Sequence, residues 1–270
     1  MSNQLFSDLG LSRRLERAEA SANAAFVESR ARLTPERAAT WIDVGGTYAM
    51  FDGVESPCTQ TFGFGLFSTP AAEQLDTLEE FFVSRGSAVF HEVSPLADLS
   101  TMSLLGDRGY RPIELTTVLH RRVDTPLPGT AASGVHVRPI SEGEGRAWAD
   151  ASARGWSEQP ELGDFMRDVG LVMTSARNVT GFVAEIDGVI AATGALSMHD
   201  GVAMLAGAST IPAFRGRGAQ NALLRARLRM AAEHGCELAA MGALPGSASQ
   251  RNAERQGFLV AYTRTKWARK

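Results

Sequence analysis

The chain has 270 residues, of which 44% are hydrophobic and 21% charged, and its formal net charge is −3. This composition is typical of globular proteins and excludes a disordered or fibrous chain, while the length suits two ordinary domains. The slightly acidic balance excludes a general affinity for nucleic acid or for an anionic membrane surface.

Three further features favour a soluble cytoplasmic protein. Charged residues recur from Arg13 to Arg32 with no apolar core of a signal peptide. No run approaches the ~18 apolar residues that a membrane-spanning helix needs. Cys58 and Cys236 lie far apart and form no C-x-x-C pair. We therefore expect no metal site and two small, buried cysteines.

The first half of the chain contains alternating helical and extended patterns. Apolar residues at helical spacing predict a helix over 11–33. Extended patterns predict strands over 41–51 and 59–67, with a turn at Asp52-Gly53 between them. Thr69-Pro70 reads as the start of a helix with Thr69 as N-cap.

That helix is predicted to end at Arg85-Gly86, and a short apolar strand over 88–93 follows it. Residues 125–134 are rich in Pro, Gly and small side chains and read as an interdomain linker. Beyond the linker, Asp187-Gly188 is a strong hairpin signal between two extended segments. The second half is predicted to contain helices over 142–153, 156–171, 221–233 and 247–255, and strands over 135–140, 181–186, 189–198, 202–210, 236–243 and 258–267.

The two halves repeat one order of elements. Residues 85–120 and residues 234–269 both read as helix end, apolar strand, proline, helix, Gly-aromatic pair and strand. This order favours two tandem copies of one fold, at 1–128 and 135–270. The alternative is that any two α/β segments share such an order of elements, glycines and prolines.

The segment most informative about chemistry is Ser209 to Gln220, a Gly- and Arg-rich loop between a strand and an apolar helix. The free N–H groups of a first helical turn and the helix dipole attract anions. Gly216 and Gly218 allow close backbone approach, and Arg215 and Arg217 add positive charge. The loop therefore predicts a pyrophosphate site.

Glycine-rich loops also occur in tight turns and in two other nucleotide-binding motifs. A lone Gly-x-Gly is also typical of a tight turn. The dinucleotide-binding fingerprint requires a third glycine, and the P-loop requires a lysine; both are absent here.

The pattern Pro212-x-x-Arg-Gly-x-Gly218, then an apolar helix, a strand, and Asn252 before Gly257-Phe258, resembles the GNAT-type N-acetyltransferases. The resemblance covers about residues 136–270. It implies an α/β fold with a mixed, mostly antiparallel sheet flanked by helices, splayed between two central parallel strands. With the repeat, it implies two tandem acetyltransferase-like domains, of which the first lacks the cofactor motif and is a degenerate copy.

The resemblance also implies that acetyl-CoA binds in the splay of the second domain. Its pantetheine arm would lie along a strand edge and its pyrophosphate on the loop amides. The implied cofactor-binding residues are Ala208, Ser209, Thr210, Ile211, Arg215, Gly216, Arg217, Gly218, Ala219, Gln220 and Asn252.

Two positions depart from the family pattern. Gln220 stands where the family usually has Gly or Ala, so its side chain would crowd the phosphate or hydrogen-bond to it. Ala253 stands where many members have the Tyr thought to protonate the departing thiolate. Ser209 and Tyr262 are the weak candidates for a catalytic role, and packing is the more common role for residues at such positions.

Other candidates have plainer readings as well. Glu185 and His199 are candidate bases or surface residues, and Arg225 with Arg229 forms a phosphate contact or a solvated face. Trp148 and Trp156 line a substrate pocket or the core. The sequence predicts acetyl transfer to a primary amine of a small-molecule or amino-acid-like acceptor, with no nucleic-acid or membrane partner. The alternative is a non-catalytic acetyl-CoA-binding regulatory module.

Overall fold

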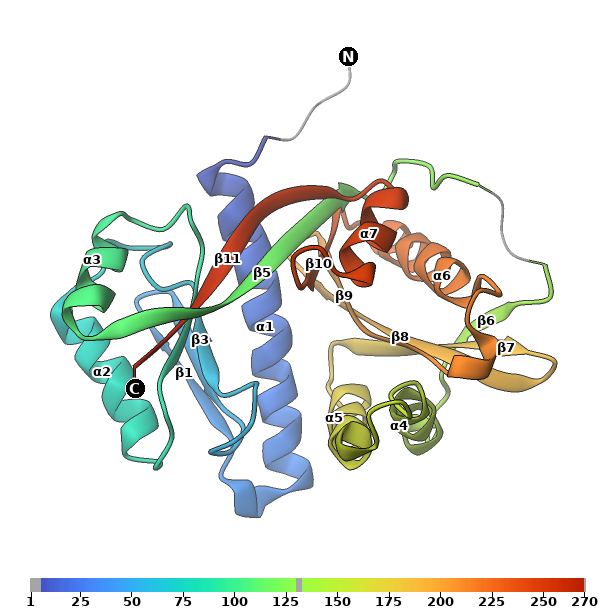
Figure 1. The fold of residues 1–270 in the computed structure, drawn as a ribbon, viewed down its shortest axis with the longest axis horizontal. Helices are drawn as coiled ribbons and strands as arrows, with labels where there is room; N and C mark the ends of the chain where they lie inside the picture. The colour runs from blue at the N-terminus through green and yellow to red at the C-terminus, as the bar shows by residue number, and fades with distance from the viewer. Residues whose placement is uncertain (1–5, 130–132, 270) are drawn as a thin grey trace. The chain divides into compact units, whose positions relative to one another are not determined.

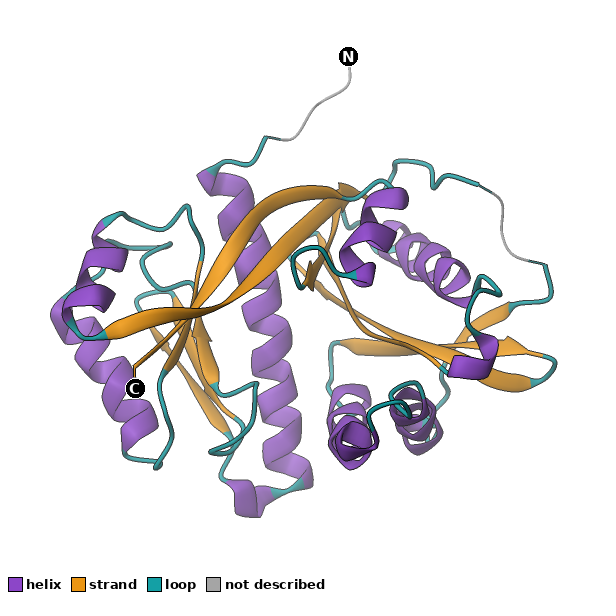
Figure 2. Cartoon of the chain, in the orientation of Figure 1, coloured by secondary structure: helices purple, strands orange, loops and turns teal. Residues whose placement is uncertain are grey.

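The computed structural model describes residues 6–129 and 133–269 of the chain. The predicted linker at 125–134 therefore lies partly outside the described residues. The chain forms two compact units: residues 1–120 with 242–270 make the first unit, and residues 121–241 make the second. Each unit is an α/β structure with a mixed sheet and helices against it (Figures 1 and 2).

In the first unit, the sheet has the strand order β1-β2-β3-β4-β11-β5. Only β3 and β4 run parallel within it. Helix α1 packs against β1, β2 and β3, and α2 lies on the opposite face (Figure 1). The elements are α1 (Leu9–Leu33), η1 (Pro35–Arg37), β1 (Thr40–Val44), β2 (Thr47–Phe51), β3 (Gln60–Phe62), α2 (Ala72–Val83), β4 (Phe90–Val93), α3 (Ser100–Asp107), β5 (Tyr110–Arg122), α7 (Ala248–Arg255) and β11 (Leu259–Arg269).

Three expectations for this unit are wrong. The segment 41–51 is not one strand, because Gly45 and Gly46 take φ of +59° and +88° and turn the chain into the β1–β2 hairpin. The strand expected over 59–67 ends at Phe62, before Gly63 at φ +85°. Thr69 is not the N-cap of α2: Ala71 is, and no side chain caps that helix.

In the second unit, the strand order is β10-β9-β8-β7-β6, with β9 and β10 parallel and the other pairs antiparallel. Helices α4 and α5 cover one face of this sheet and α6 the other (Figure 1). The elements are β6 (His136–Pro139), α4 (Gly145–Arg154), η2 (Pro160–Leu162), α5 (Gly163–Thr174), β7 (Val179–Ile186), β8 (Val189–His199), β9 (Val202–Thr210), η3 (Pro212–Phe214), α6 (Ala219–Glu233) and β10 (Leu238–Ala243, of which the residues to Met241 belong to this unit).

The grouping of the chain by contacts differs from the predicted repeat at its C-terminal end. Residues 242–270 belong to the first unit, where β11 pairs antiparallel with β4 and with β5. The division at 1–128 and 135–270 rests on the repeated order of elements and stays a prediction. Among the described helices, none is both long and apolar enough to cross a membrane.

The splay expected from the resemblance is present in the second unit. The parallel pairing of β9 with β10 runs from Val202↔Leu238 to Met204↔Ala240 and includes no later residue of β9. Beyond this point Ala206 and Ala208 are exposed. The C-terminal half of β9 therefore presents an open edge, which leads directly into the loop before α6.

Candidate cofactor site on strand β9 and helix α6

A β-bulge interrupts β9 where its pairing with β10 ends. Thr193 pairs with Ser209 and Ala195 with Ala206, so Gly194 alone faces Gly207 and Ala208. Gly207 takes φ of +60°, and a Cβ there would lie 2.8 Å from the Trp148 ring. Such a bulge bends the strand and changes the direction of its N–H and C=O groups. The predicted residues from Ala208 to Ile211 thus lie on the part of β9 that follows the bend.

The loop after β9 presents N–H groups to solvent. Gly216 and Gly218 take φ of +76° and +82°, and Gly218 is the N-cap of α6. No side chain caps this helix. A Cβ at Gly216 would meet nothing within 4 Å. The first-turn N–H groups, which have no partner inside a helix, are thus open to an anion.

Two arginines flank these N–H groups and pair with carboxylates of neighbouring turns. Arg215 Nη1 lies 2.6 Å from Glu158 Oε2, and Arg215 Nη2 donates to Gly155 O at 3.2 Å. Arg217 Nη2 lies 3.1 Å from Asp187 Oδ2. Both arginine side chains are about half exposed, at 46% and 47%. Such surface pairs contribute about 0–1 kcal/mol, so a phosphate group can displace them.

Gln220 does not point into the loop, contrary to both expectations for it. Its Nε2 donates to Ser209 O at 2.8 Å, to Thr210 Oγ1 at 3.0 Å and to Thr193 O at 3.3 Å. The side chain therefore turns back onto the sheet because the bulge leaves acceptors there. The phosphate-facing side of the first helical turn stays clear of it.

Ser209 is held by packing. Its Oγ donates to Ser152 O at 2.8 Å, and the residue is 7% exposed. A Cβ on Gly155 would lie 1.8 Å from that Oγ and 3.1 Å from Thr210 N. The C-terminal end of α4 thus packs directly against the C-terminal end of β9.

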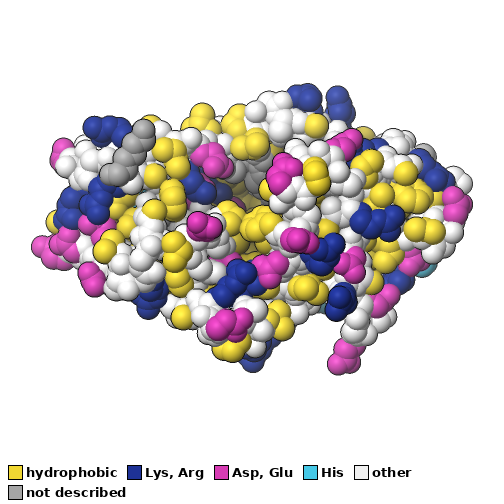
Figure 3. All heavy atoms as spheres, turned by 60° about the horizontal axis from the view of Figure 1, so that its bottom comes forward, with side chains coloured by type: hydrophobic (Ala, Val, Ile, Leu, Met, Phe, Trp, Pro, Cys, Tyr) yellow, Lys and Arg dark blue, Asp and Glu magenta, His cyan; other side chains and the backbone are white. Residues whose placement is uncertain are grey.

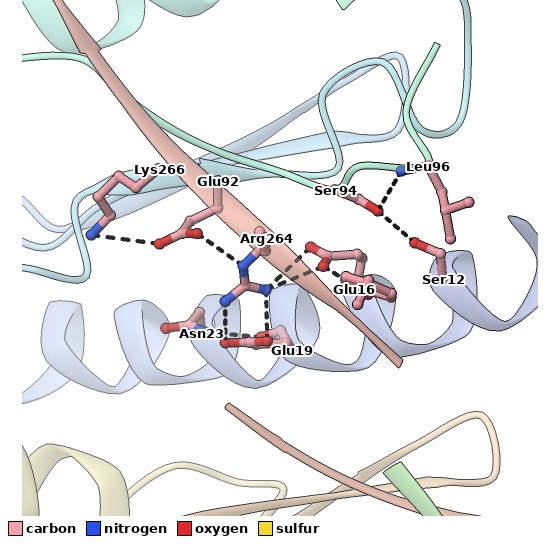
Figure 4. A network of polar contacts seen from close by, with 10 residues as sticks. Ser12, Glu16, Glu19, Asn23, Glu92, Ser94, Leu96, Arg264 and Lys266 are labelled. Carbon is pink, nitrogen blue, oxygen red and sulfur yellow. Dashed lines mark hydrogen bonds and ion pairs between the residues drawn. The ribbon is translucent and has the colours of Figure 1, made fainter. Parts of the chain in front are cut away.

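Tyr262 and Asn252 lie in the first unit, not in the unit that carries the loop. Tyr262 Oη donates to Glu16 Oε1 at 2.9 Å, and Asn252 Oδ1 accepts from Arg255 Nη1 at 3.0 Å. Tyr262 borders a buried network in which Arg264 contacts Glu16, Glu19 and Glu92 (Figure 4). Burial raises the pKa of Glu16 to about 7, and burial also raises that of Tyr262.

The other candidates take mostly structural positions. Glu185 pairs with Arg138 at 2.8 Å, and His199 Nε2 lies 3.5 Å from Asp200 Oδ2. Trp148 is 1% exposed and donates to Phe182 O. Trp156 and the two cysteines are half-buried, and Arg225 donates to the carbonyls of Pro128 and Gly129.

Arg227 is a residue of this region that the sequence analysis missed. It is 4% exposed, and its Nη1 donates to Ala195 O at 3.2 Å and to Ala206 O at 3.3 Å. The available signal was its position: Leu223, Leu224, Leu228 and Ala231 form the buried stripe of α6, and Arg227 stands within it. A charged residue in an apolar stripe indicates a specific partner.

Comparison with known proteins agrees with this geometry. Residues 146–258 match the Acetyltransferase (GNAT) family. No curated protein matches the chain. A GCN5-related N-acetyltransferase from Kribbella flavida has a similar structure, with a TM-score of 0.65, 18% identity, and coverage of 93% of this chain and 95% of that one.

Two further structures show the same fold. A GCN5-related N-acetyltransferase from Sphaerobacter thermophilus gives a TM-score of 0.57 at 20% identity, covering 78% of this chain and 71% of that one. A tandem GNAT protein from the clavulanic acid biosynthesis pathway gives 0.60 at 13% identity, covering 98% and 96%. The expected mixed sheet and splay are confirmed, and residues 146–258 form a domain that matches the GNAT acetyltransferase family.

Proposed function

We propose that the chain transfers an acetyl group from acetyl-CoA to a primary amine of a small-molecule or amino-acid-like acceptor. The match of residues 146–258 to the GNAT family implies acyl transfer from an acyl-CoA. The observation that carries the proposal is the open edge of β9, which leads into the uncapped N-terminus of α6 between Arg215 and Arg217. These residues fit a thioester arm ending in a pyrophosphate.

Each part of the site has a distinct task in this proposal. The N–H groups from Gly216 to Gln220 hold the pyrophosphate, since the Arg215 N–H already donates to Pro212 O, and Arg215 and Arg217 exchange their carboxylate partners for it. The edge from Ala208 to Ile211 holds the pantetheine arm. The backbone of β9 beside the bulge donates to the thioester oxygen as negative charge develops there.

The amine must be neutral to attack, although a lysine-like amine has a pKa of about 10.4 in water. Holding the amine and the thioester together supplies much of the acceleration. Ser209 and Tyr262 remain the weak candidates for protonating the thiolate, and the hydroxyl of each already donates to another residue. The absence of a tyrosine at Ala253 favours the second candidate function, a non-catalytic acetyl-CoA-binding regulatory module.

The acceptor in this proposal is a small molecule and not a nucleic acid. The formal net charge is −3. On the face drawn in Figure 3, basic and acidic side chains are interspersed and no continuous basic surface is present. A nucleic-acid site requires clustered positive charge, so we do not expect binding to DNA or RNA.

A screen of primary amines with acetyl-CoA and a thiol-detecting reagent separates the two candidate functions. An enzyme releases CoA in an amine-dependent manner, and Arg217→Glu abolishes this release while Arg229→Glu, on the exposed face of α6, leaves it unchanged. Binding of acetyl-CoA without release by any amine would favour the regulatory module. Equal release by Arg217→Glu and wild type would contradict the site.

A further inference from the structure

The bulge in β9 creates a hydrogen-bonding problem that ordinary strand pairing does not solve. Two residues, Gly207 and Ala208, face the single residue Gly194, so the ladder is locally broken. A buried carbonyl left without a donor costs about 1–3 kcal/mol. Side chains must therefore supply the missing donors at this point.

Thr193 Oγ1 on β8 donates to Gly207 O at 3.1 Å, and helix α6 supplies further donors, from two of its turns, to the residue pairs on either side of the bulge. In the first turn, Gln220 donates to Ser209 O and Thr193 O, on the two strands that form the bulge. Two turns later, Arg227 donates to Ala206 O and Ala195 O, which belong to the pair that precedes the bulge. The two side chains thus hold the bulge from both ends.

The fit of Arg227 is tight and specific. A Cβ on Gly194 would lie 2.9 Å from the Arg227 guanidinium carbon, so a larger residue at 194 would displace the guanidinium from its present position. Arg227 donates to three carbonyl oxygens, those of Leu223, Ala195 and Ala206. Burial lowers the pKa of Arg227 to about 10, so it stays charged at neutral pH. A buried charge is costly unless its hydrogen bonds are needed.

We propose that Gln220 and Arg227 are positioning residues for acyl transfer: they hold the bulged backbone of Ala206 to Thr210 in the orientation that donates to the thioester oxygen. This inference rests on the proposed function. The same helix carries the pyrophosphate site at its N-terminus. One element therefore fixes the pyrophosphate and the thioester at a set distance.

The test is the infrared spectrum of acetyl-CoA labelled with ¹³C at the thioester carbonyl, bound to wild type, Gln220→Met, Arg227→Met and Arg227→Lys. In wild type, donors on β9 lower the carbonyl stretching frequency relative to free acetyl-CoA. In Gln220→Met and Arg227→Met, this shift is lost while the Kd for acetyl-CoA changes by less than about threefold, because the pyrophosphate contacts remain. Arg227→Lys restores part of the shift. Arg229→Met is the matched control, because Arg229 is exposed on the same helix.

Where an accepting amine is found, both Met variants lower kcat about 10- to 100-fold with little change in KM for acetyl-CoA. An unchanged carbonyl frequency in Gln220→Met and Arg227→Met would overturn the inference. Failure of wild type to bind acetyl-CoA would instead overturn the proposed function. Should Arg227→Met not fold, the carbonyl frequency is compared between wild type, Gln220→Met and Arg227→Lys. An unchanged frequency in Gln220→Met would then overturn the inference.

Discussion

The two units contain the same connection, a strand followed by a loop and a helix, but use it differently. In the second unit, the loop over 211–218 exposes its N–H groups and two arginines. In the first unit, the glycine-containing part of the loop, residues 63–66, is buried together with Phe64 and Leu66, and only its later part, with Ser68 and Thr69, is exposed. The difference lies in which face of the loop meets solvent.

The packing of glycines marks this difference. A Cβ at Gly216 would meet no atom within 4 Å, whereas one at Gly65 would lie 1.9 Å from Thr101 Oγ1. Arg13 Nε donates to Leu66 O at 2.8 Å. This arginine therefore binds a carbonyl of the first loop itself, whereas Arg215 and Arg217 are half exposed beside the second loop. The comparison teaches that glycines in such a loop indicate an anion site only where the space above them is open.

The largest expected effect comes from Phe64→Ala in the first unit. Phe64 is fully buried in a cluster with Leu75, Leu105 and Tyr110. Its truncation should cost about 3–5 kcal/mol, measured by urea unfolding. Calorimetry of this variant should still find one acetyl-CoA site per chain, because the first loop has no open anion site. A second site in this variant would show that the first loop can also bind the cofactor.

Gly216→Ala should weaken acetyl-CoA binding at least about tenfold, or about 1.4 kcal/mol, because a methyl group enters the space where phosphate approaches. Gly86→Ala in the first unit is the matched control. Gly86 takes φ of +70° and is equally open. Both variants should lose about 1–2 kcal/mol of stability from backbone strain. Equal affinities in the two variants would place the phosphate elsewhere.

Asp187→Asn should strengthen acetyl-CoA binding by up to about fivefold at low salt, because it frees Arg217 from an ion pair worth at most about 1 kcal/mol. The gain should disappear at 1 M salt, where the Debye length is about 3 Å. Asp200→Asn is the control, since Asp200 occupies the other hairpin turn of this unit with a similar positive φ. A weaker affinity for Asp187→Asn would mean that Asp187 itself contacts the cofactor.

The buried network of the first unit makes the stability of that unit depend on pH. The pKa of Glu16 is raised to about 7, mainly by burial, so the folded state holds its proton more tightly than the unfolded chain. Glu16 therefore contributes stability below about pH 4.5 that is lost as the pH rises through 7. Relative to Glu16→Gln, the wild type should lose stability between pH 5 and 8, followed by thermal unfolding. A parallel pH dependence in the two proteins would contradict this.

Local signals in the sequence predicted several features of both units. The Asp187-Gly188 hairpin is confirmed, and so is the helix start at Ser247, whose side chain accepts from Gln250 N. The Gly-Arg loop was recognisable because its glycines and charges are contiguous in sequence. Each of these features depends on residues a few positions apart.

Features that depend on distant residues were not predictable in the same way. The pairing of β11 with β4 joins residues about 170 positions apart, such as Thr265 with Val93. The direction of Gln220 depends on a bulge in a neighbouring strand, which one sequence does not display. Arg227 was within reach, because its place in an apolar helical stripe is visible in the sequence, whereas its contact with Gly194 is not.

The central claim is that a single acyl-CoA site is built from β9 and the N-terminus of α6. The most direct test is calorimetric titration of acetyl-CoA into wild type and into Arg217→Glu. We predict one site per chain in wild type and loss of measurable binding in the variant, because a carboxylate then faces the pyrophosphate. Two sites per chain, or binding that Arg217→Glu leaves unchanged, would contradict the claim.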